Sequence, residues 1–362
     1  MLTTTISLLS VLMAAIVGFA THRASLCTVR AVAEVMNARS AYMFLSFAKA
    51  VLWASAIGSL LVIWFHFPAP MILMRASLAF ALLGGFVFGV GAAINGGCSL
   101  STLQRFADGD LSMLVTIVGF GIGAFGWIAL DALWLFSEHA QVMPLAVVLP
   151  KADDSWTLLF IWTWALFEFF ALVIPAIATR RVFTNLLAPT YRLSTAAALL
   201  GIAGGILYAT QGSWTYTSFY YSSVTAFTGG ISPSIWHALL VGALLLGMIV
   251  SSTQRKSFEL RSWHQGRLWV RRFAGGCLMG VGGLLMPGGN DTLLLSAMPA
   301  LSSQALLVFG GLVVGIAVTL AAMKQLKLPM SGVHCANDEC REVPIVSHRI
   351  SLPSAGSHFP AV

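Results

Sequence analysis

Charged side chains are scarce in this sequence. Only 9% of the 362 residues are Asp, Glu, Lys or Arg, whereas a soluble domain carries about 25%. Apolar residues make up 58% of the chain, which is more than a soluble fold could keep away from water. The composition therefore excludes an ordinary soluble domain and indicates a protein whose solvent is the lipid bilayer.

Cysteine is also sparse, and five cysteines in a chain of this length exclude the disulfide framework of a small secreted protein. No Cys-x-x-Cys pair occurs, and His334, Cys335 and Cys340 near the C-terminus form only a partial ligand set, so we expect no metal and no cofactor. The net charge of +7 comes from basic residues between apolar runs, so we expect no nucleic-acid partner. No Lys or Arg precedes the first apolar run, which we interpret as a retained helix.

Long apolar runs dominate the rest of the chain. Nine of them can cross about 30 Å of hydrocarbon, which takes about 17–25 residues each. Four shorter apolar segments resemble re-entrant helices, which need protein or a cavity around them. We therefore predict an all-α polytopic membrane protein with nine transmembrane helices and about four short re-entrant helices. The long runs lie near 3–20, 41–65, 75–95, 111–135, 156–178, 194–210, 234–251, 268–287 and 302–322, and the short segments at 24–37, 98–108, 214–228 and 291–299.

The two halves of the chain share a glycine pattern. GGFVFGVGAAI at 84–94 and GGCLMGVGGLL at 275–285 agree at five of eleven positions, and a Gly-Gly pair follows each. A fainter echo relates 18–28 to 205–215. Each half contains four spans, which return the chain to the side where it started. The one joining span then places the start of the second repeat on the opposite side, so the two repeats are inverted, as in many transporters. The predicted parts are a first repeat (1–137), a linking helix with its loops (138–193), a second repeat (194–323) and a flexible cytoplasmic tail (324–362).

The Lys and Arg residues predict an orientation in a bacterial inner membrane. Seventeen fall on one side of the nine spans and two, Arg75 and Lys151, on the other, while Lys49 lies inside a span. The rich side should be cytoplasmic, which puts the N-terminus in the periplasm and the C-terminus in the cytoplasm. The seventeen are Arg23, Arg30, Arg39, Arg105, Arg180, Arg181, Arg192, Arg255, Lys256, Arg261, Arg267, Arg271, Arg272, Lys324, Lys327, Arg341 and Arg349.

Two glycine-rich breaks each open a short helix. Glycine permits the tight turn, and the polar residues that follow are of types that favour the N-cap. A helix N-terminus favours an anion, so two facing termini could hold one without a buried Lys or Arg. The alternative is a pair of close-packed turns. The residues concerned are Gly96, Gly97, Cys98 and Ser99 in the first break, and Gly288, Gly289, Asn290, Asp291 and Thr292 in the second.

Three cysteines adjoin these features: Cys27, Cys98 and Cys277. Each could be a small buried hydrophobe. Three converging thiols would instead offer soft, weak donors to a sulfur-containing anion, which must bind weakly enough to leave. Elsewhere, Glu168 in the linking span is a candidate functional residue, but we expect it to pair with Lys49 or with a backbone group. The aromatic segment 214–221 is interpreted as an interfacial belt.

The motifs resemble the YeeE/YedE family of sulfur-transport membrane proteins. The resemblance lies in RFAGGCLMGVGGLLMPGGNDTLLL (272–295), GFVFGVGAAINGGCSLSTLQR (85–105) and, more loosely, GFATHRASLCTVR (18–30). It implies an hourglass-shaped α-helical protein of nine spans and four short helices that imports thiosulfate. It also implies that Cys27, Cys98 and Cys277 pass the anion along by S–H contacts. Around Cys27 the family tends to show an Arg-Gly-Arg-Phe-Cys-like string, whereas this chain has His22-Arg23-Ala24-Ser25-Leu26-Cys27.

Thiosulfate transport is thus the leading prediction, without enzymatic activity. The alternatives are a membrane sulfurtransferase that carries sulfane sulfur as a cysteine persulfide, transport of a selenium-containing compound, and a structural subunit with inert cysteines. Exchange chemistry needs an activated thiolate, and no His or Lys stands close to Cys98 in the sequence. A cytoplasmic sulfur-carrier protein or sulfurtransferase is a further candidate partner.

Overall fold

The computed structural model describes residues 2–67, 73–74, 77–132, 143–144, 155–178, 188–227, 232–261, 266–286, 288–328, 331–336 and 339–344. Within these ranges every predicted apolar run forms a helix. The nine long helices are α1 (Leu2–Arg23), α3 (Tyr42–Trp64), α4 (Leu78–Asn95), α6 (Met113–Ala132), α7 (Ser155–Ala178), α9 (Leu193–Gln211), α11 (Ile235–Arg255), α12 (Gly266–Leu285) and α14 (Ser303–Gln325). The short ones are α2 (Thr28–Ala38), α5 (Ser99–Ala107), α10 (Tyr216–Ala226), and α13 (Asn290–Thr292) with its π-helical continuation η2 (Leu293–Ala297).

The chain is a multi-pass membrane protein. Seven helical stretches in the described part are long and apolar enough to cross a bilayer. Large side chains on the outer helices point away from the protein, as on α7, where Phe160 is 62% and Phe167 70% exposed; such surface needs lipid. The seven stretches are Thr5–Ala38, Tyr42–Trp64, Leu78–Ala107, Met113–Leu130, Leu193–Ala226, Ile235–Arg255 and Ser303–Gln325.

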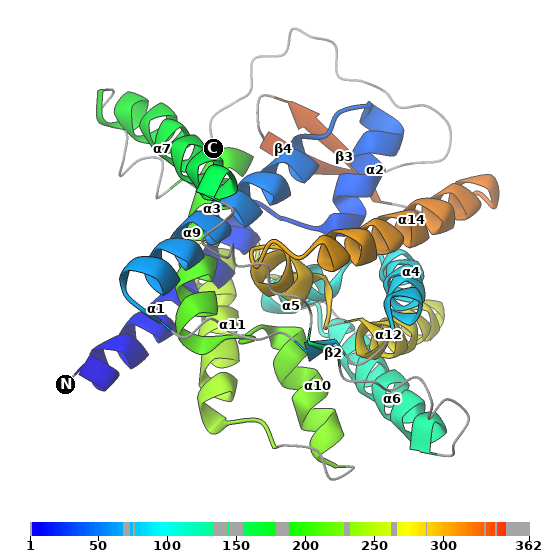
Figure 1. Cartoon of the computed structure of the whole chain (residues 1–362). Coiled ribbons are helices and arrows are strands. Elements are labelled where there is room, and N and C mark those ends of the chain that lie inside the picture. Colours follow the sequence, from blue (N-terminus) through cyan, green and yellow to red (C-terminus); the bar gives the residue numbers. More distant parts are fainter. Residues whose placement is uncertain are drawn as a thin grey trace, which may run out of the picture.

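The long helices form two groups around the short ones (Figure 1). In one group α3 packs on α9 and α11 packs on α1, while α1 and α9 touch each other. In the other group α6 packs on α12 and α14 packs on α4, while α4 and α12 touch each other. Helix α7 lies outside the first group, against α3. The short helix α5 lies between the groups in Figure 1.

Glycine allows the close approach of α6 to α12. A side chain at Gly123 would overlap the backbone of Cys277, and one at Gly280 would overlap the backbone of Phe120. In contrast, a Cβ at Gly126, on the same helix as Gly123, would meet nothing within 4 Å. Lipid gives helices no hydrophobic reason to associate, so backbone packing at small residues takes that role.

The predicted pairing of Lys49 with Glu168 is confirmed. Lys49 Nζ on α3 lies 2.6 Å from Glu168 Oε1 on α7 and 3.1 Å from the Ser194 hydroxyl. The glutamate side chain is only 10% exposed, and a buried carboxylate in a membrane helix needs such a partner. The pair therefore fixes the linking helix to the first group of long helices.

The all-α prediction needs one addition. Strands β1 (Leu73–Met74) and β2 (Met143–Pro144) pair antiparallel between helices. In the predicted tail, β3 (Ser331–Ala336) and β4 (Glu339–Pro344) form an antiparallel hairpin in which Cys335 pairs with Cys340 across the strands. Strand β3 lies against α2, as Figure 1 shows. The hairpin satisfies backbone groups of both strands next to α2.

Candidate functional site

The N-termini of the four short helices meet in the interior of the protein. The Asn290 amide of α13 donates to the Thr28 hydroxyl of α2 at 3.1 Å. The Ser99 hydroxyl of α5 lies 2.6 Å from Asn290 Oδ1 and 3.1 Å from Asp291 Oδ1. Asp291 Oδ2 accepts the backbone N–H of Thr217, at the start of α10, at 3.1 Å. One hydrogen-bonded chain therefore joins helix starts from both halves of the sequence.

Both predicted glycine turns are present. Gly96 has φ +82° and Gly288 has φ +116°, a region that L-residues with a side chain rarely occupy. The second glycine of each pair is required by packing, because a Cβ at Gly97 would overlap the Ser101 hydroxyl and one at Gly289 would come within 2.6 Å of Asp291 Oδ1. The two breaks therefore depend on glycine for two different reasons.

The N-cap role expected of the polar residues is wrong. The N-cap of α5 is Cys98 and that of α13 is Gly289, and neither makes a side-chain capping bond. Ser99, Asp291 and Thr292 lie one to three residues further on, inside the first turn. Side chains in this position project from the helix toward its neighbours, so they bond across the short helices rather than cap their own.

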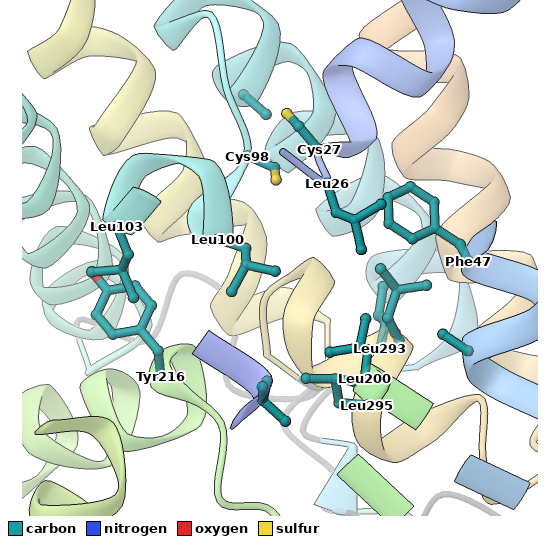
Figure 2. Close-up of a cluster of buried hydrophobic side chains, with 14 of the residues drawn as sticks. Leu26, Cys27, Phe47, Cys98, Leu100, Leu103, Leu200, Tyr216, Leu293 and Leu295 are labelled. Carbon is teal, nitrogen blue, oxygen red and sulfur yellow. The ribbon is translucent and has the colours of Figure 1, made fainter. Parts of the chain in front are cut away.

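Cys27 and Cys98 occupy matching positions. Cys27 is the N-cap of α2 and Cys98 is the N-cap of α5, both with extended backbone. Each residue is 1% exposed, and the two thiols are close enough to hydrogen bond with each other. Figure 2 shows them side by side at one edge of a cluster of Leu, Phe and Tyr side chains. The first turns of two helices and two soft sulfur atoms thus face one small volume.

Cys277 lies in the middle of α12, and its exposure is intermediate. Its backbone packs against Gly119 and Gly123 of α6. No interaction reported among the described residues links its thiol to Cys27 or Cys98. The relay through three thiols stays a prediction. The structure brings two of these thiols together, those of Cys27 and Cys98.

The second break carries hydroxyl groups instead of thiols. Thr292 Oγ1 lies 2.7 Å from Thr215 Oγ1, 3.0 Å from Thr217 Oγ1 and 3.2 Å from Ser218 Oγ. This cluster was not predicted from the sequence. The faint echo between 18–28 and 205–215 was the available signal, because it aligns the start of α2 with the start of α10.

The interpretation of residues 214–221 as an interfacial belt is wrong. Trp214 is fully buried, and Tyr216 and Tyr221 are each 7% exposed. The Tyr221 hydroxyl donates to the carbonyl of Met279 at 3.1 Å, on α12. The aromatic rings fill the space around the hydroxyl cluster, since α10 enters the protein instead of lying at its surface.

The two breaks therefore present different chemistry. Asp291 already places a carboxylate at the N-terminus of α10, and Gly289 N–H donates to the Thr217 hydroxyl at 2.9 Å. The starts of α2 and α5 carry the Cys27 and Cys98 thiols, and Asp291 also accepts the Ser99 hydroxyl at the start of α5. The anion-binding role of residues 96–99 and of residues 288–292 stays a prediction.

A polar network holds the ends of α1, α5 and α11 together near the thiol pair. The buried His22 ring lies 2.9 Å from the Ser251 hydroxyl and 3.0 Å from Asp108 Oδ1. Ser252 and Ser257 donate to the same carboxylate oxygen at 2.8 and 2.6 Å. Burial raises the pKa of Asp108, but the hydrogen bonds from His22 and the serines outweigh it and hold the pKa below its ordinary value.

No group of three or more His, Cys, Asp or Glu side chains in the described part of the chain could hold a metal ion. The starts of the short helices offer thiols, hydroxyls and backbone N–H groups, a set suited to weak contacts with a passing anion.

Comparison with known proteins gives one family and one relative. The family model described as "Sulphur transport" matches residues 23–318. A protein named thiosulfate transporter TsuA, from Spirochaeta thermophila, is 26% identical over 248 residues, which is 63% of this chain and 73% of that protein. The matched region contains every short helix and every residue of the thiol pair and the hydroxyl cluster.

Proposed function

Because the chain belongs to the sulphur transport (YeeE/YedE) family, we propose that it is a transporter or channel that imports thiosulfate across the bacterial inner membrane. The relative named as a thiosulfate transporter supports this substrate. We assign it no enzymatic activity.

The thiol pair is the observation that carries the proposal. Cys27 and Cys98 are buried N-cap residues whose sulfur atoms lie together, next to the first-turn N–H groups of two helices. A thiosulfate ion has anionic oxygens and one soft terminal sulfur. Helix N-termini attract the charge, and thiols donate weakly to sulfur, so the ion can bind and still leave.

The packing of the long helices supports two inverted repeats. The contact of α3 with α9 has its counterpart in that of α11 with α1, and the contact of α6 with α12 in that of α14 with α4. This is the pattern expected when α1 to α6 correspond in order to α9 to α14. We propose that all nine long helices span the membrane and that the repeats enclose a pathway near the midplane.

Topology gives a direct test of the inverted repeats. Reporter fusions should place Arg261 in the cytoplasm and Lys151 in the periplasm, because the Lys and Arg bias of seventeen to two fixes this orientation. At each position, alkaline phosphatase activity indicates the periplasm and fluorescent-protein emission indicates the cytoplasm, and the two signals are compared. If both positions lay on the same side of the membrane, the number of crossings between the repeats would not be odd, and the repeats would not be inverted.

Uptake tests the substrate. Cells that lack other sulfate and thiosulfate importers should accumulate sulfur-35 from thiosulfate only when they express this chain. A large excess of unlabelled sulfate should leave the uptake nearly unchanged, since sulfate has no soft terminal sulfur for Cys27 and Cys98 to contact. Equal competition by the two anions would show that the thiols do not select for sulfur.

A further inference from the structure

A cavity of about 290 Å³ lies beside the first glycine break. Residues of α2, α4, α5, α12 and α14 line it. Four of the lining residues are the arginines Arg30, Arg105, Arg271 and Arg272, and no acidic residue is among the described residues that line it. Among the described residues, the wall of the cavity therefore carries four guanidinium groups, of which that of Arg272 is paired with Asp110.

The guanidinium groups gather around Gly96. Arg105 Nη1 lies 3.8 Å, and Arg271 Nη2 4.0 Å, from the place that a Cβ on Gly96 would occupy. Arg271 is within electrostatic range of Arg105 and Arg272, and Arg30 is within range of Arg105. Like charges held this close repel one another. An anion bound among the guanidinium groups would attract each of them and so offset their mutual repulsion.

Arg272 shows an unmet bonding capacity at the same place. Its two terminal nitrogens donate to Asp110 Oδ1 and Oδ2 at 2.8 and 2.9 Å. Its Nε is buried and has no hydrogen-bond partner in the described structure, although the residue as a whole is only 6% exposed. A buried N–H without an acceptor is unfavourable, so Arg272 keeps a bonding capacity that its ion pair with Asp110 does not use.

The cavity adjoins the thiol pair. Gly96 lines it, and Cys98 follows two residues later; Arg30 lines it from α2, which begins at the Cys27 N-cap. Its other walls are the last turn of α4, the first turns of α12 and the end of α14. The proposed orientation puts all these helix ends at the cytoplasmic side.

We propose that this arginine cavity is an anion-binding site that receives a divalent oxyanion after it has passed the thiol pair. This inference rests on the proposed function for its direction of travel. None of the described residues that line the cavity is a cysteine, and guanidinium groups bind the oxygens of sulfate and thiosulfate alike. The cavity thus selects for negative charge, whereas the thiol pair selects for sulfur.

Arginine footprinting of the full chain in detergent tests the site without any mutation. The protein is treated with an arginine-specific dicarbonyl reagent in sulfate, in thiosulfate, or in chloride of equal ionic strength, and the modified residues are located by mass spectrometry. Both divalent anions should protect Arg105 and Arg271. Arg267, which is exposed on the same helix as Arg271 and does not line the cavity, should react equally in all three.

Variants give the affinity. Arg271→Gln and Arg105→Gln should each weaken sulfate binding to the purified protein by about 10- to 100-fold, the usual effect of losing one charged hydrogen bond. Arg267→Gln is the matched control and should bind sulfate as the unchanged protein does. Titration calorimetry with inorganic sulfate measures all three.

The outcomes separate this site from the transport proposal. Sulfate protection of Arg105 and Arg271 in a protein that takes up no thiosulfate would overturn the transport function and keep the anion site. Thiosulfate uptake without any protection would overturn the anion site and keep the function. Protection by thiosulfate alone would overturn the claim that the cavity selects for charge, and equal protection of Arg267 would overturn the site as a whole.

Discussion

Asp291→Ala should abolish thiosulfate uptake and lower the thermal unfolding midpoint sharply. The Asp291 carboxylate accepts the Thr217 N–H at 3.1 Å and the Thr217 hydroxyl at 2.7 Å, and Oδ1 lies 3.1 Å from the Ser99 hydroxyl. It thereby joins the starts of α5, α10 and α13. Each buried donor left without an acceptor costs about 1–3 kcal/mol, and two such losses are large against a stability of about 5–15 kcal/mol.

Ser296 provides the matched control for this substitution. It is fully buried in η2, four residues after Thr292, and its hydroxyl has no hydrogen-bond partner among the described residues. Ser296→Ala should therefore leave both uptake and the unfolding midpoint close to those of the unchanged protein. Asp291→Asn keeps one acceptor oxygen and should fall between the two. The measurements are sulfur-35 uptake and fluorescence-monitored unfolding in detergent.

A second outcome would change the interpretation of Asp291. If Asp291→Ala kept full uptake, the junction of the short helices would not be part of the transport pathway. If uptake were lost while the unfolding midpoint stayed normal, the carboxylate would act on the anion or its route directly, since a structural role alone would move the midpoint. Both results can be told apart in one set of protein preparations.

The helices were predictable from the sequence because their signals are local. A run of about 20 apolar residues is long enough to span the bilayer, and Gly96 and Gly288 mark the turns that need a left-handed backbone. The structure confirms that these runs form helices and that both glycines have a positive φ. The partner of Glu168 was predictable for a similar reason, because a buried carboxylate needs a cation and Lys49 is the only Lys or Arg that lies away from the ends of a predicted span.

The chemistry around those helices was predictable only in part. The Thr215, Thr217 and Thr292 hydroxyls come from segments more than 70 residues apart, and their meeting depends on how α10 and α13 pack. The arginine cavity has the same origin, because five helices contribute to it. Charge counting assigned Arg105 and Arg271 to the cytoplasmic side, but it contains no information on the distance between them.

Cys98→Ser should reduce thiosulfate uptake by about tenfold or more, the equivalent of about 1.4 kcal/mol in the barrier, and Cys98→Ala should reduce it further. The thiol stands at the N-cap of α5, against Cys27, and is 1% exposed. A serine hydroxyl is smaller, harder and more strongly hydrated than a thiol, so it keeps a donor but loses the soft contact with sulfur. Alanine loses the donor as well.

A covalent route makes a different prediction for the same residue. If Cys98 carried the sulfur as a persulfide, Cys98→Ser and Cys98→Ala would be equally inactive, because neither side chain can form the adduct. The decisive measurement is mass spectrometry of protein alkylated during uptake. An added sulfur on Cys98, formed and discharged at the transport rate, would refute the non-covalent pathway, whereas graded losses without the adduct would support it.

Cys277→Ser completes this experiment, since α12 holds the third thiol apart from the pair. Among the described residues, no hydrogen bond joins the Cys277 thiol to Cys27 or Cys98, and the backbone of Cys277 packs on Gly123 of α6. A loss as large as that of Cys98→Ser would extend the pathway to the third thiol, as the family resemblance implies. A loss much smaller than that would confine the sulfur-selective contacts to the two N-caps, where two helix starts supply the attraction for the anion's charge.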